Sequence, residues 1–315
     1  MSPLPPLPPR LQIEVTNRCA LGCTSCARHH WDTAANPIGD LSEDTLDRLA
    51  PLLDSAIEVT VGGYGDPTEG PMLLPLVRRA KESGCSVRLI TGGAKLTPRL
   101  IEELADAGLD RLVLSMDGAT DATLRALRGV PLRAWLKWIR AARPLRPIVQ
   151  LNFVAQWPNI AELPALVQLC DDEGVAGIHA FHLKSYTPDT LECCLLTDLP
   201  AAQPHFDAAA ALAARLGVFL HLPNPDGCRQ PFEHLFVRHD GAVRGCCSGL
   251  FEPADFGLVA GRIEDGPEAL WEAPLLQQFR AASIGDADFP DACTACAWRV
   301  PTLEAHRRPL AVLRA

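Results

Sequence analysis

The chain has 315 residues, of which 48% are hydrophobic and 21% charged, with a net charge of −9 and 12 cysteines. This composition is typical of a folded enzyme and excludes an intrinsically disordered chain. The 29 Lys and Arg residues are scattered, which argues against a nucleic-acid partner. The chain has neither an apolar signal segment nor a run of eighteen apolar residues, so we predict a cytoplasmic protein without a membrane partner, whose cysteines serve metal or redox chemistry.

Short apolar runs alternate with helical segments from residue 11 to residue 183, as in a parallel sheet with crossover helices. Strands are predicted at residues 11–15, 57–61, 87–90, 111–115, 149–154 and 177–183. Ser42 is predicted to cap a helix, and Gly84, Gly108 and Gly174 to end later ones. We therefore predict an α/β fold built on a partial (βα)6 barrel, with its function at the C-terminal ends of the strands.

The pattern changes after residue 183. A helix is predicted at residues 201–216, a strand at 218–222, a hairpin at 235–246 that turns at Asp240-Gly241, and a helix within 267–282. We place a domain boundary between residues 183 and 199. The predicted parts are an N-terminal extension (1–10), the barrel (11–190), a small α+β domain (191–305) and a tail (306–315).

Three cysteines near the N-terminus, Cys19, Cys23 and Cys26, have the spacing C-x3-C-x2-C. Thiolates at this spacing on one loop can converge on a soft metal. Because no fourth cysteine lies equally close, one coordination position stays open. A zinc site and three unrelated thiols are the alternative interpretations.

A second cysteine group lies in the C-terminal third and consists of Cys228, Cys246, Cys293 and Cys296. The predicted hairpin and a tight C-x2-C clip could bring its thiolates together as a complete shell for an iron-sulfur cluster or for a structural zinc. Cys247 is an alternative ligand, a hydrogen-atom donor that faces the active site, or a spare thiol beside Cys246. The adjacent Cys193 and Cys194 are ambiguous, because adjacent cysteines rarely bind one metal together.

The N-terminal trio resembles the signature of the radical S-adenosylmethionine (SAM) superfamily, with Ser25 at a position that is often aromatic. The resemblance implies that the trio holds a four-iron, four-sulfur cluster whose unique iron binds SAM. It also implies reductive cleavage of SAM to a 5'-deoxyadenosyl radical, which can abstract hydrogen from an unactivated C–H bond. A reductant protein such as flavodoxin or ferredoxin is the implied partner.

Three later stretches resemble motifs with which this superfamily binds SAM. The residues implied to contact SAM are Gly63, Tyr64, Gly65, Asp66, Thr91, Ser115 and Asp117. Asp66 stands where a Gly-Glu-Pro motif has Glu, and would face the ammonium group of SAM. Ser115 and Asp117 alternate at a strand end, so both can face the bound nucleoside. A loop without any ligand is the alternative for each stretch taken alone.

The C-terminal cysteines, with Trp271 between them, resemble the SPASM/Twitch auxiliary-cluster domain. The four-cysteine form is similar to that of 2-deoxy-scyllo-inosamine dehydrogenase, a radical SAM alcohol oxidase. This resemblance implies a second four-iron, four-sulfur cluster. A fully ligated cluster has no open iron for a substrate, so we interpret it as an electron acceptor.

We therefore predict a radical SAM oxidoreductase of natural-product biosynthesis that oxidises an alcohol of a small polyhydroxylated metabolite, such as an aminocyclitol or sugar. The alternatives are cross-linking or epimerisation of a ribosomally made peptide, and a redox-neutral dehydration or decarboxylation. Only about ten residues precede the first predicted strand, so no leader-binding domain is expected, which favours the small substrate. An electron-transfer protein with two clusters would not need the SAM motifs.

Candidate catalytic residues lie at the end of the sixth predicted strand: His182, Lys184 and Tyr186. Alternation places His182 and Lys184 on one face of this strand, where we expect the substrate. A basic group whose pKa is lowered by burial could accept the hydroxyl proton of the substrate. A hydrogen-bonded His and a surface Lys are the alternative interpretation.

Overall fold

The computed structural model describes residues 4–30, 33–34, 36–145, 147–184, 188–223, 230–246, 259–283 and 287–289. Its strands are β1 (Arg10–Ile13), β2 (Glu58–Val61), β3 (Ser86–Thr91), β4 (Arg111–Ser115), β5 (Ile148–Ala155), β6 (Gly177–His182), β7 (Phe219–His221), β8 (His234–Val237), β9 (Ala242–Arg244) and β10 (Val259–Arg262). Its α-helices are α1 (Glu43–Arg48), α2 (Ala50–Ser55), α3 (Leu73–Glu82), α4 (Pro98–Asp106), α5 (Asp121–Arg128), α6 (Leu132–Ala142), α7 (Leu163–Glu173), α8 (Pro188–Glu192), α9 (Leu199–Leu216), α10 (Gln230–Glu233), α11 (Pro267–Trp271) and α12 (Pro274–Ser283).

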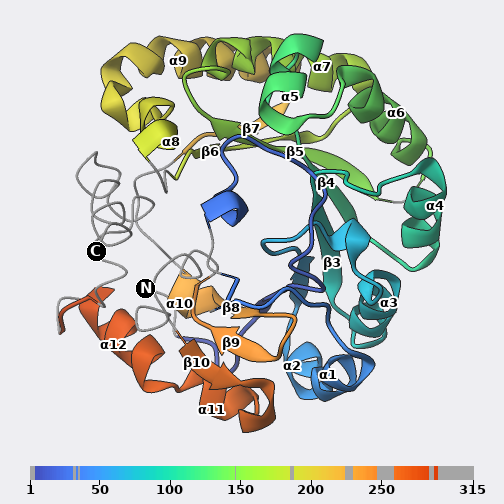
Figure 1. Ribbon diagram of the computed structural model, residues 1–315, viewed down its shortest axis with the longest axis vertical. Helices are drawn as coiled ribbons and strands as arrows, with labels where there is room; N and C mark the ends of the chain where they lie inside the picture. The colour runs from blue at the N-terminus through green and yellow to red at the C-terminus, as the bar shows by residue number, and fades with distance from the viewer. Residues whose placement is uncertain are drawn as a thin grey trace.

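The strands of the described residues form one sheet, in the order β10-β9-β8-β1-β2-β3-β4-β5-β6-β7. Neighbours from β8 to β7 are parallel, whereas β9 is antiparallel to both β8 and β10. The sheet curves, and helices α3, α4, α6, α7 and α9 lie along its outer side (Figure 1). The predicted α/β partial barrel is confirmed, since β1 to β6 are its six parallel strands.

The local start and stop signals also act as predicted. The Ser42 hydroxyl accepts a hydrogen bond from the Thr45 amide at 3.0 Å and so caps α1. Gly84, Gly108 and Gly174 follow α3, α4 and α7 with φ angles of 83°, 97° and 69°, which glycine adopts without strain. The last predicted helix is instead two helices, α11 and α12. Pro274 begins the second because it has no amide hydrogen to continue the first.

The C-terminal hairpin adds to the barrel sheet. Strands β8 and β9 form the predicted hairpin, and β8 lies parallel to β1 with Leu235 beside Leu11 and Val237 beside Ile13. The predicted strand at residues 218–222 is β7, which pairs in parallel with β6 at the other edge. Strand β7 and the β8–β9 hairpin both come after the predicted domain boundary in the sequence. The four domain ranges stay predictions.

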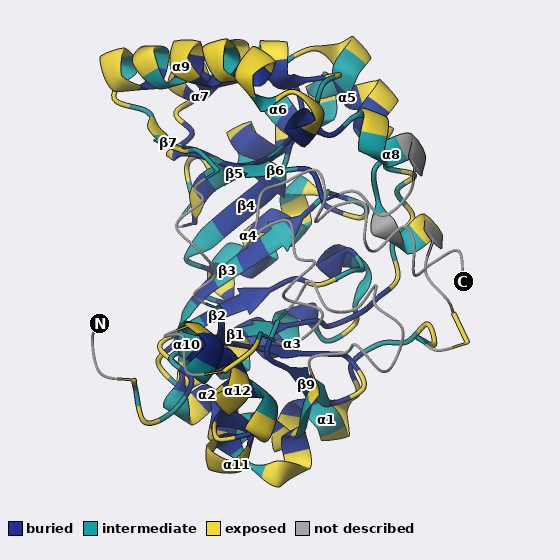
Figure 2. Ribbon diagram, turned by 90° about the vertical axis from the view of Figure 1, so that its left-hand side faces the viewer, coloured by how far each residue is buried: buried dark blue, intermediate teal, exposed yellow. Residues whose placement is uncertain are grey.

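Buried apolar side chains fill the space between the sheet and its outer helices. Leu11 and Ile13 of β1, Leu76 of α3 and Trp135 of α6 are fully buried. Burial of each such side chain stabilises the fold by about 1.5–3 kcal/mol. Figure 2 shows the strands mostly buried and the outward faces of the helices exposed. No described helix combines the length and apolar character that a membrane span needs.

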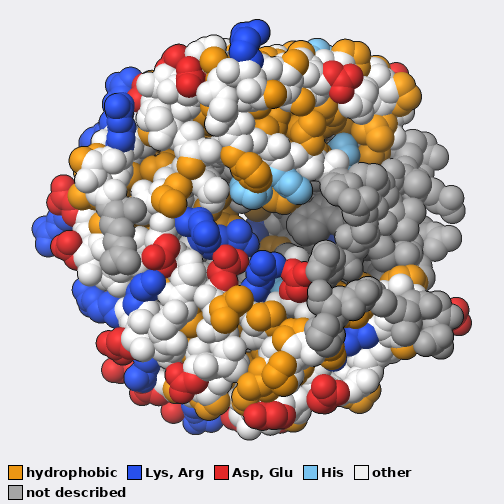
Figure 3. Space-filling model, turned by 180° about the vertical axis from the view of Figure 1, so that it is seen from behind, with side chains coloured by type: hydrophobic (Ala, Val, Ile, Leu, Met, Phe, Trp, Pro, Cys, Tyr) orange, Lys and Arg blue, Asp and Glu red, His pale blue; other side chains and the backbone are white. Residues whose placement is uncertain are grey.

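Charged side chains meet at the N-terminal ends of the strands. Glu58 of β2 lies within 4.0 Å of Arg10 of β1, Arg88 of β3 and Arg111 of β4. Seen from behind, basic and acidic side chains lie close together in the middle of the molecule (Figure 3). These ion pairs occupy the end of the barrel opposite to the end where function is expected.

Candidate active site

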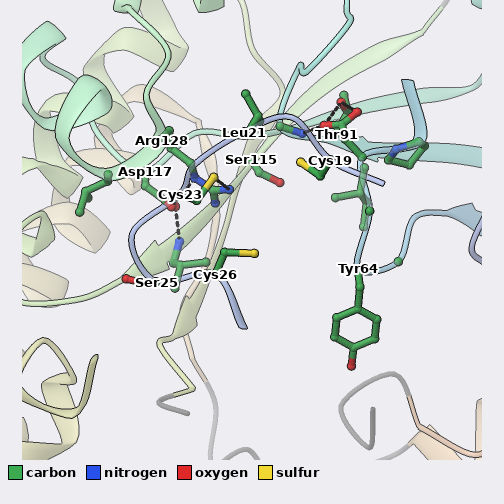
Figure 4. Close-up of a pocket in the computed structure, with 18 of the residues that line it drawn as sticks. Cys19, Leu21, Cys23, Ser25, Cys26, Tyr64, Thr91, Ser115, Asp117 and Arg128 are labelled. Atoms are coloured by element: carbon green, nitrogen blue, oxygen red, sulfur yellow. Dashed lines mark hydrogen bonds and ion pairs between the residues drawn. The ribbon is translucent and has the colours of Figure 1, made fainter. Parts of the chain in front are cut away.

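A pocket of about 250 Å³ lies at the C-terminal ends of the barrel strands. Its lining includes all three cysteines of the N-terminal trio and all seven residues predicted to contact SAM. Figure 4 shows the cysteines on the loop after β1, near Thr91 and Ser115 at the ends of β3 and β4 and Asp117 just after β4. The structure therefore brings together residues that span about a hundred positions of the sequence, although their contact with SAM stays a prediction.

The trio fits an iron-sulfur cluster. Cys19, Cys23 and Cys26 are free, partly buried thiols. Burial raises the pKa of Cys19 to about 11 and also raises that of Cys23, so a bound metal would supply the positive charge that the thiolates need. No three His, Cys, Asp or Glu side chains of the described residues converge on a single-ion site. A four-iron cluster would take one thiolate of the trio at each of three irons.

Gly65 brings the loop after β2 against the segment before the cysteines. A Cβ atom at Gly65 would lie 2.4 Å from the Thr16 carbonyl oxygen and 2.5 Å from that of Arg18. The Asp66 amide donates a hydrogen bond to the same Arg18 oxygen at 2.7 Å. The close approach of the two backbones therefore requires glycine at position 65.

We expect Gly65→Ala to lower the free energy of unfolding by about 1–3 kcal/mol, because the added methyl group pushes two rigid backbones apart. Chemical denaturation of the iron-free protein measures this loss. Gly22→Ala is the matched control, since its Cβ would have nothing within 4 Å. Equal stability of the two variants would contradict the close approach.

The Asp66 carboxylate joins two loops of the pocket. Its side chain is 3% exposed and accepts hydrogen bonds from the Thr91 hydroxyl at 2.8 Å and the Gly92 amide at 2.8 Å. It also accepts from the Thr68 amide and hydroxyl. Because both oxygens are engaged, Asp66 joins the loops after β2 and β3.

Arg128, which no motif marks in the sequence, forms a partly buried ion pair with the buried Asp117 in the pocket wall. Its Nε donates to Asp117 Oδ2 at 2.6 Å, and its Nη1 lies 3.8 Å from Cys23 Sγ. Burial alone would lower the pKa of Arg128, but the charges of Asp117 and Cys23 raise it above its usual range. Asp117 is held in turn by the Val154 amide, which donates to its Oδ1 at 2.8 Å. The pocket therefore contains a fixed positive charge beside one cysteine.

Gln156 is a second pocket residue that sequence patterns did not indicate. The Ser25 hydroxyl donates to Gln156 Oε1 at 2.9 Å, and Gln156 is 1% exposed. Ser25 occupies the position that is often aromatic in the radical SAM signature. A hydrogen bond to the end of β5 therefore anchors the cysteine loop here.

His182 is not among the described residues that line this pocket, and its catalytic role stays a prediction. Leu183 lines the pocket, so alternation directs His182 to the other face of the strand. There its ring packs edge-on against Phe206 of α9, with 6.0 Å between centroids, and burial lowers its pKa. Lys184 is buried and is not among the described residues that line the pocket. Tyr186 lies outside the described residues.

The second cysteine group is described in part. Cys246 follows β9 and packs beside Phe279 of α12. The other predicted ligands, Cys228, Cys293 and Cys296, lie outside the described residues, as does Cys247. Their convergence on a cluster therefore stays a prediction from the sequence. Burial raises the pKa of both Cys193 and Cys194, and neither lines the described pocket.

Family models match two parts of the chain: the radical SAM superfamily over residues 13–155, and an iron-sulfur cluster-binding domain, SPASM, over residues 228–297. A PqqA peptide cyclase from Gluconobacter oxydans is 30% identical and covers 93% of this chain and 84% of that protein. A tungsten-containing aldehyde ferredoxin oxidoreductase cofactor-modifying protein from Pyrococcus furiosus is 26% identical over 57% of this chain. This chain spans about half the length of the Pyrococcus protein.

Solved structures share the fold. SuiB from Streptococcus suis has a TM-score of 0.67 and 17% identity, covering 87% of this chain and 68% of that one. BtrN in complex with AdoMet and 2-DOIA has a TM-score of 0.52 and 14% identity, covering 98% and 92%. These similarities agree with the cysteine trio and with the pocket on a partial barrel. Together with the two family models and the cyclase relative, they identify the chain as a member of the radical SAM superfamily with a C-terminal SPASM iron-sulfur domain.

Proposed function

We propose that this enzyme modifies a ribosomally made peptide, by cross-linking or epimerisation, through radical chemistry at the pocket. The observation that carries this proposal is the 30% identity to a PqqA peptide cyclase over 93% of this chain. That similarity includes the barrel and the C-terminal region together. It favours the peptide alternative over oxidation of a small alcohol, which has only the fold-level likeness to BtrN behind it.

The pocket has groups suited to SAM. Cys19, Cys23 and Cys26 would hold the cluster, which supplies the electron for reductive cleavage of SAM. The partly buried Arg128 guanidinium, fixed by Asp117, would offer its remaining N–H donors to a carboxylate. Ser115 lines the same wall and offers a hydroxyl to the ribose. Leu21, Ile90 and Val154 provide apolar surface beside these polar groups.

The second cysteine group would hold an auxiliary cluster within the SPASM match. Cross-linking removes two hydrogens from the peptide: one leaves as a hydrogen atom in 5'-deoxyadenosine, and the other as a proton and an electron. An auxiliary cluster that accepts this electron balances the reaction. Epimerisation would instead return a hydrogen to the same carbon.

The proposal is tested with anaerobically reconstituted protein, SAM and dithionite. One arm contains any short peptide that a neighbouring gene is found to encode, and the other a panel of aminocyclitols and sugars. We expect the peptide to raise 5'-deoxyadenosine formation above the substrate-free rate and to lose two hydrogens, or to gain one deuterium from D2O on epimerisation, by mass spectrometry. Turnover of a polyol with the peptide left unchanged would support alcohol oxidation instead.

A further inference from the structure

Glu14 is a fully buried carboxylate that lies between the pocket loop after β2 and the C-terminal hairpin. It follows β1 directly and is 0% exposed. Its Oε2 accepts a hydrogen bond from the Tyr64 amide at 2.8 Å, and its Oε1 lies 2.9 Å from His239 Nδ1. A buried carboxylate destabilises the fold unless it is hydrogen-bonded or paired. The Tyr64 amide and the His239 ring therefore offset the cost of burying Glu14.

The pocket loop is fitted closely to this carboxylate. A Cβ atom at Gly63 would lie 2.4 Å from Glu14 Oε2 and 2.6 Å from its Cγ, so the loop can pass over Glu14 only because residue 63 is glycine. Gly63 and Tyr64 both line the pocket. A shift of Glu14 would therefore displace Gly63 and Tyr64, which form part of the pocket wall.

His239 supplies the other side of the contact. It lies between β8 and β9, is 6% exposed, and is packed so that a Cβ at Gly39 would approach its Nε2 to 2.8 Å. The ring of Tyr64 also packs edge-on against Phe236 of β8, with 6.2 Å between centroids. The Tyr64 ring thus contacts the hairpin directly, and the Tyr64 amide is linked to it through Glu14 and His239. The second strand of this hairpin leads to Cys246.

We propose that Glu14 and His239 are positioning residues for the pocket. They hold the Gly63–Gly65 loop in the shape that SAM requires, and they make that shape depend on the hairpin that leads to the auxiliary-cluster cysteines. Disturbing the hairpin at His239 therefore weakens SAM binding at a distance. The proposal concerns SAM binding alone and rests on the assignment of this pocket to SAM, whatever the substrate.

Two measurements test the pair. Hydrogen exchange of the iron-free protein, followed by mass spectrometry, reports the Tyr64 amide, and equilibrium dialysis of the reconstituted protein reports SAM affinity. We expect Glu14→Leu and His239→Leu each to speed exchange at residues 62–66 and to weaken SAM binding about tenfold, as for the loss of one hydrogen bond to a charged group. Glu14→Gln keeps an acceptor for the Tyr64 amide, so it should retain most of the protection from exchange at residues 62–66 and most of the SAM affinity.

Arg262→Ala is the matched control. The Arg262 guanidinium donates to the Asp240 carbonyl at 2.7 Å in the same hairpin turn and makes no described contact with Glu14. We expect it to lower the melting temperature without changing exchange at residues 62–66. If the Leu variants do not fold, His239→Asn replaces them, since it retains a polar side chain but shortens the reach to Glu14.

Unchanged exchange and SAM affinity in the folded His239 variant would overturn the proposal and leave the pair a role in stability alone. A wild-type protein that binds no SAM would instead contradict the assignment of the pocket. The exchange measurement separates these results, because it reports the Glu14 contact in protein without cluster or SAM.

Discussion

Replacement of Cys19, Cys23 and Cys26 together with Ala should abolish 5'-deoxyadenosine formation and remove about half of the iron. The wild-type protein should hold about eight irons after reconstitution, because each cysteine group can support a four-iron cluster. The triple variant loses the ligands that line the pocket and should keep about four. Iron and sulfide analysis, with chromatography of the SAM cleavage products, measures both effects.

The matched control is Cys193→Ala, which removes a partly buried thiol away from the described pocket lining. It should keep wild-type iron content and SAM cleavage. Equal deoxyadenosine yields from the triple variant and the wild type would contradict the assignment of the trio. Zinc in the C-terminal site of reconstituted protein would contradict the second cluster.

Replacement of Arg128 with Met should destabilise the iron-free protein by about 3 kcal/mol, because it leaves the Asp117 carboxylate buried without its partner. The two side chains are 15% and 6% exposed. Asp117→Asn combined with Arg128→Met should regain part of this loss, since the amide oxygen can still accept from the Val154 amide and no charge is left unpaired. Urea denaturation of the three proteins measures the differences.

Arg125→Met on the same helix is the control. Arg125 pairs with Asp121 at 2.6 Å, but the side chains are 51% and 52% exposed, so its loss should cost less than about 1 kcal/mol. Equal effects of the Arg125 and Arg128 variants would show that burial does not distinguish the two pairs. A double variant less stable than Arg128→Met alone would show that Asp117 is stabilised by other groups.

The sequence alone determined the structural features that depend only on residues adjacent in the chain. Apolar runs predicted the six barrel strands, and Gly84, Gly108 and Gly174 ended their helices, because the backbone shape needed there favours glycine whatever surrounds it. The spacing of Cys19, Cys23 and Cys26 confined three thiols to one short loop. These signals were sufficient to predict the barrel, whereas the residues predicted to contact SAM came from the resemblance to superfamily motifs at the C-terminal ends of its strands.

Only the tertiary structure decided how separate elements meet. Alternation gave two faces to the sixth strand, but the pairing of β6 with β5 and the packing of α9 decided that Leu183 faces the pocket and His182 faces Phe206. Arg128 and Gln156 carry no motif, because each is positioned by a helix or strand end far from the cysteines in sequence. Glu14 and His239 are separated by 225 residues and meet because β8 pairs with β1. Local sequence preferences specify each strand, whereas the register between distant strands follows from burial of the whole core.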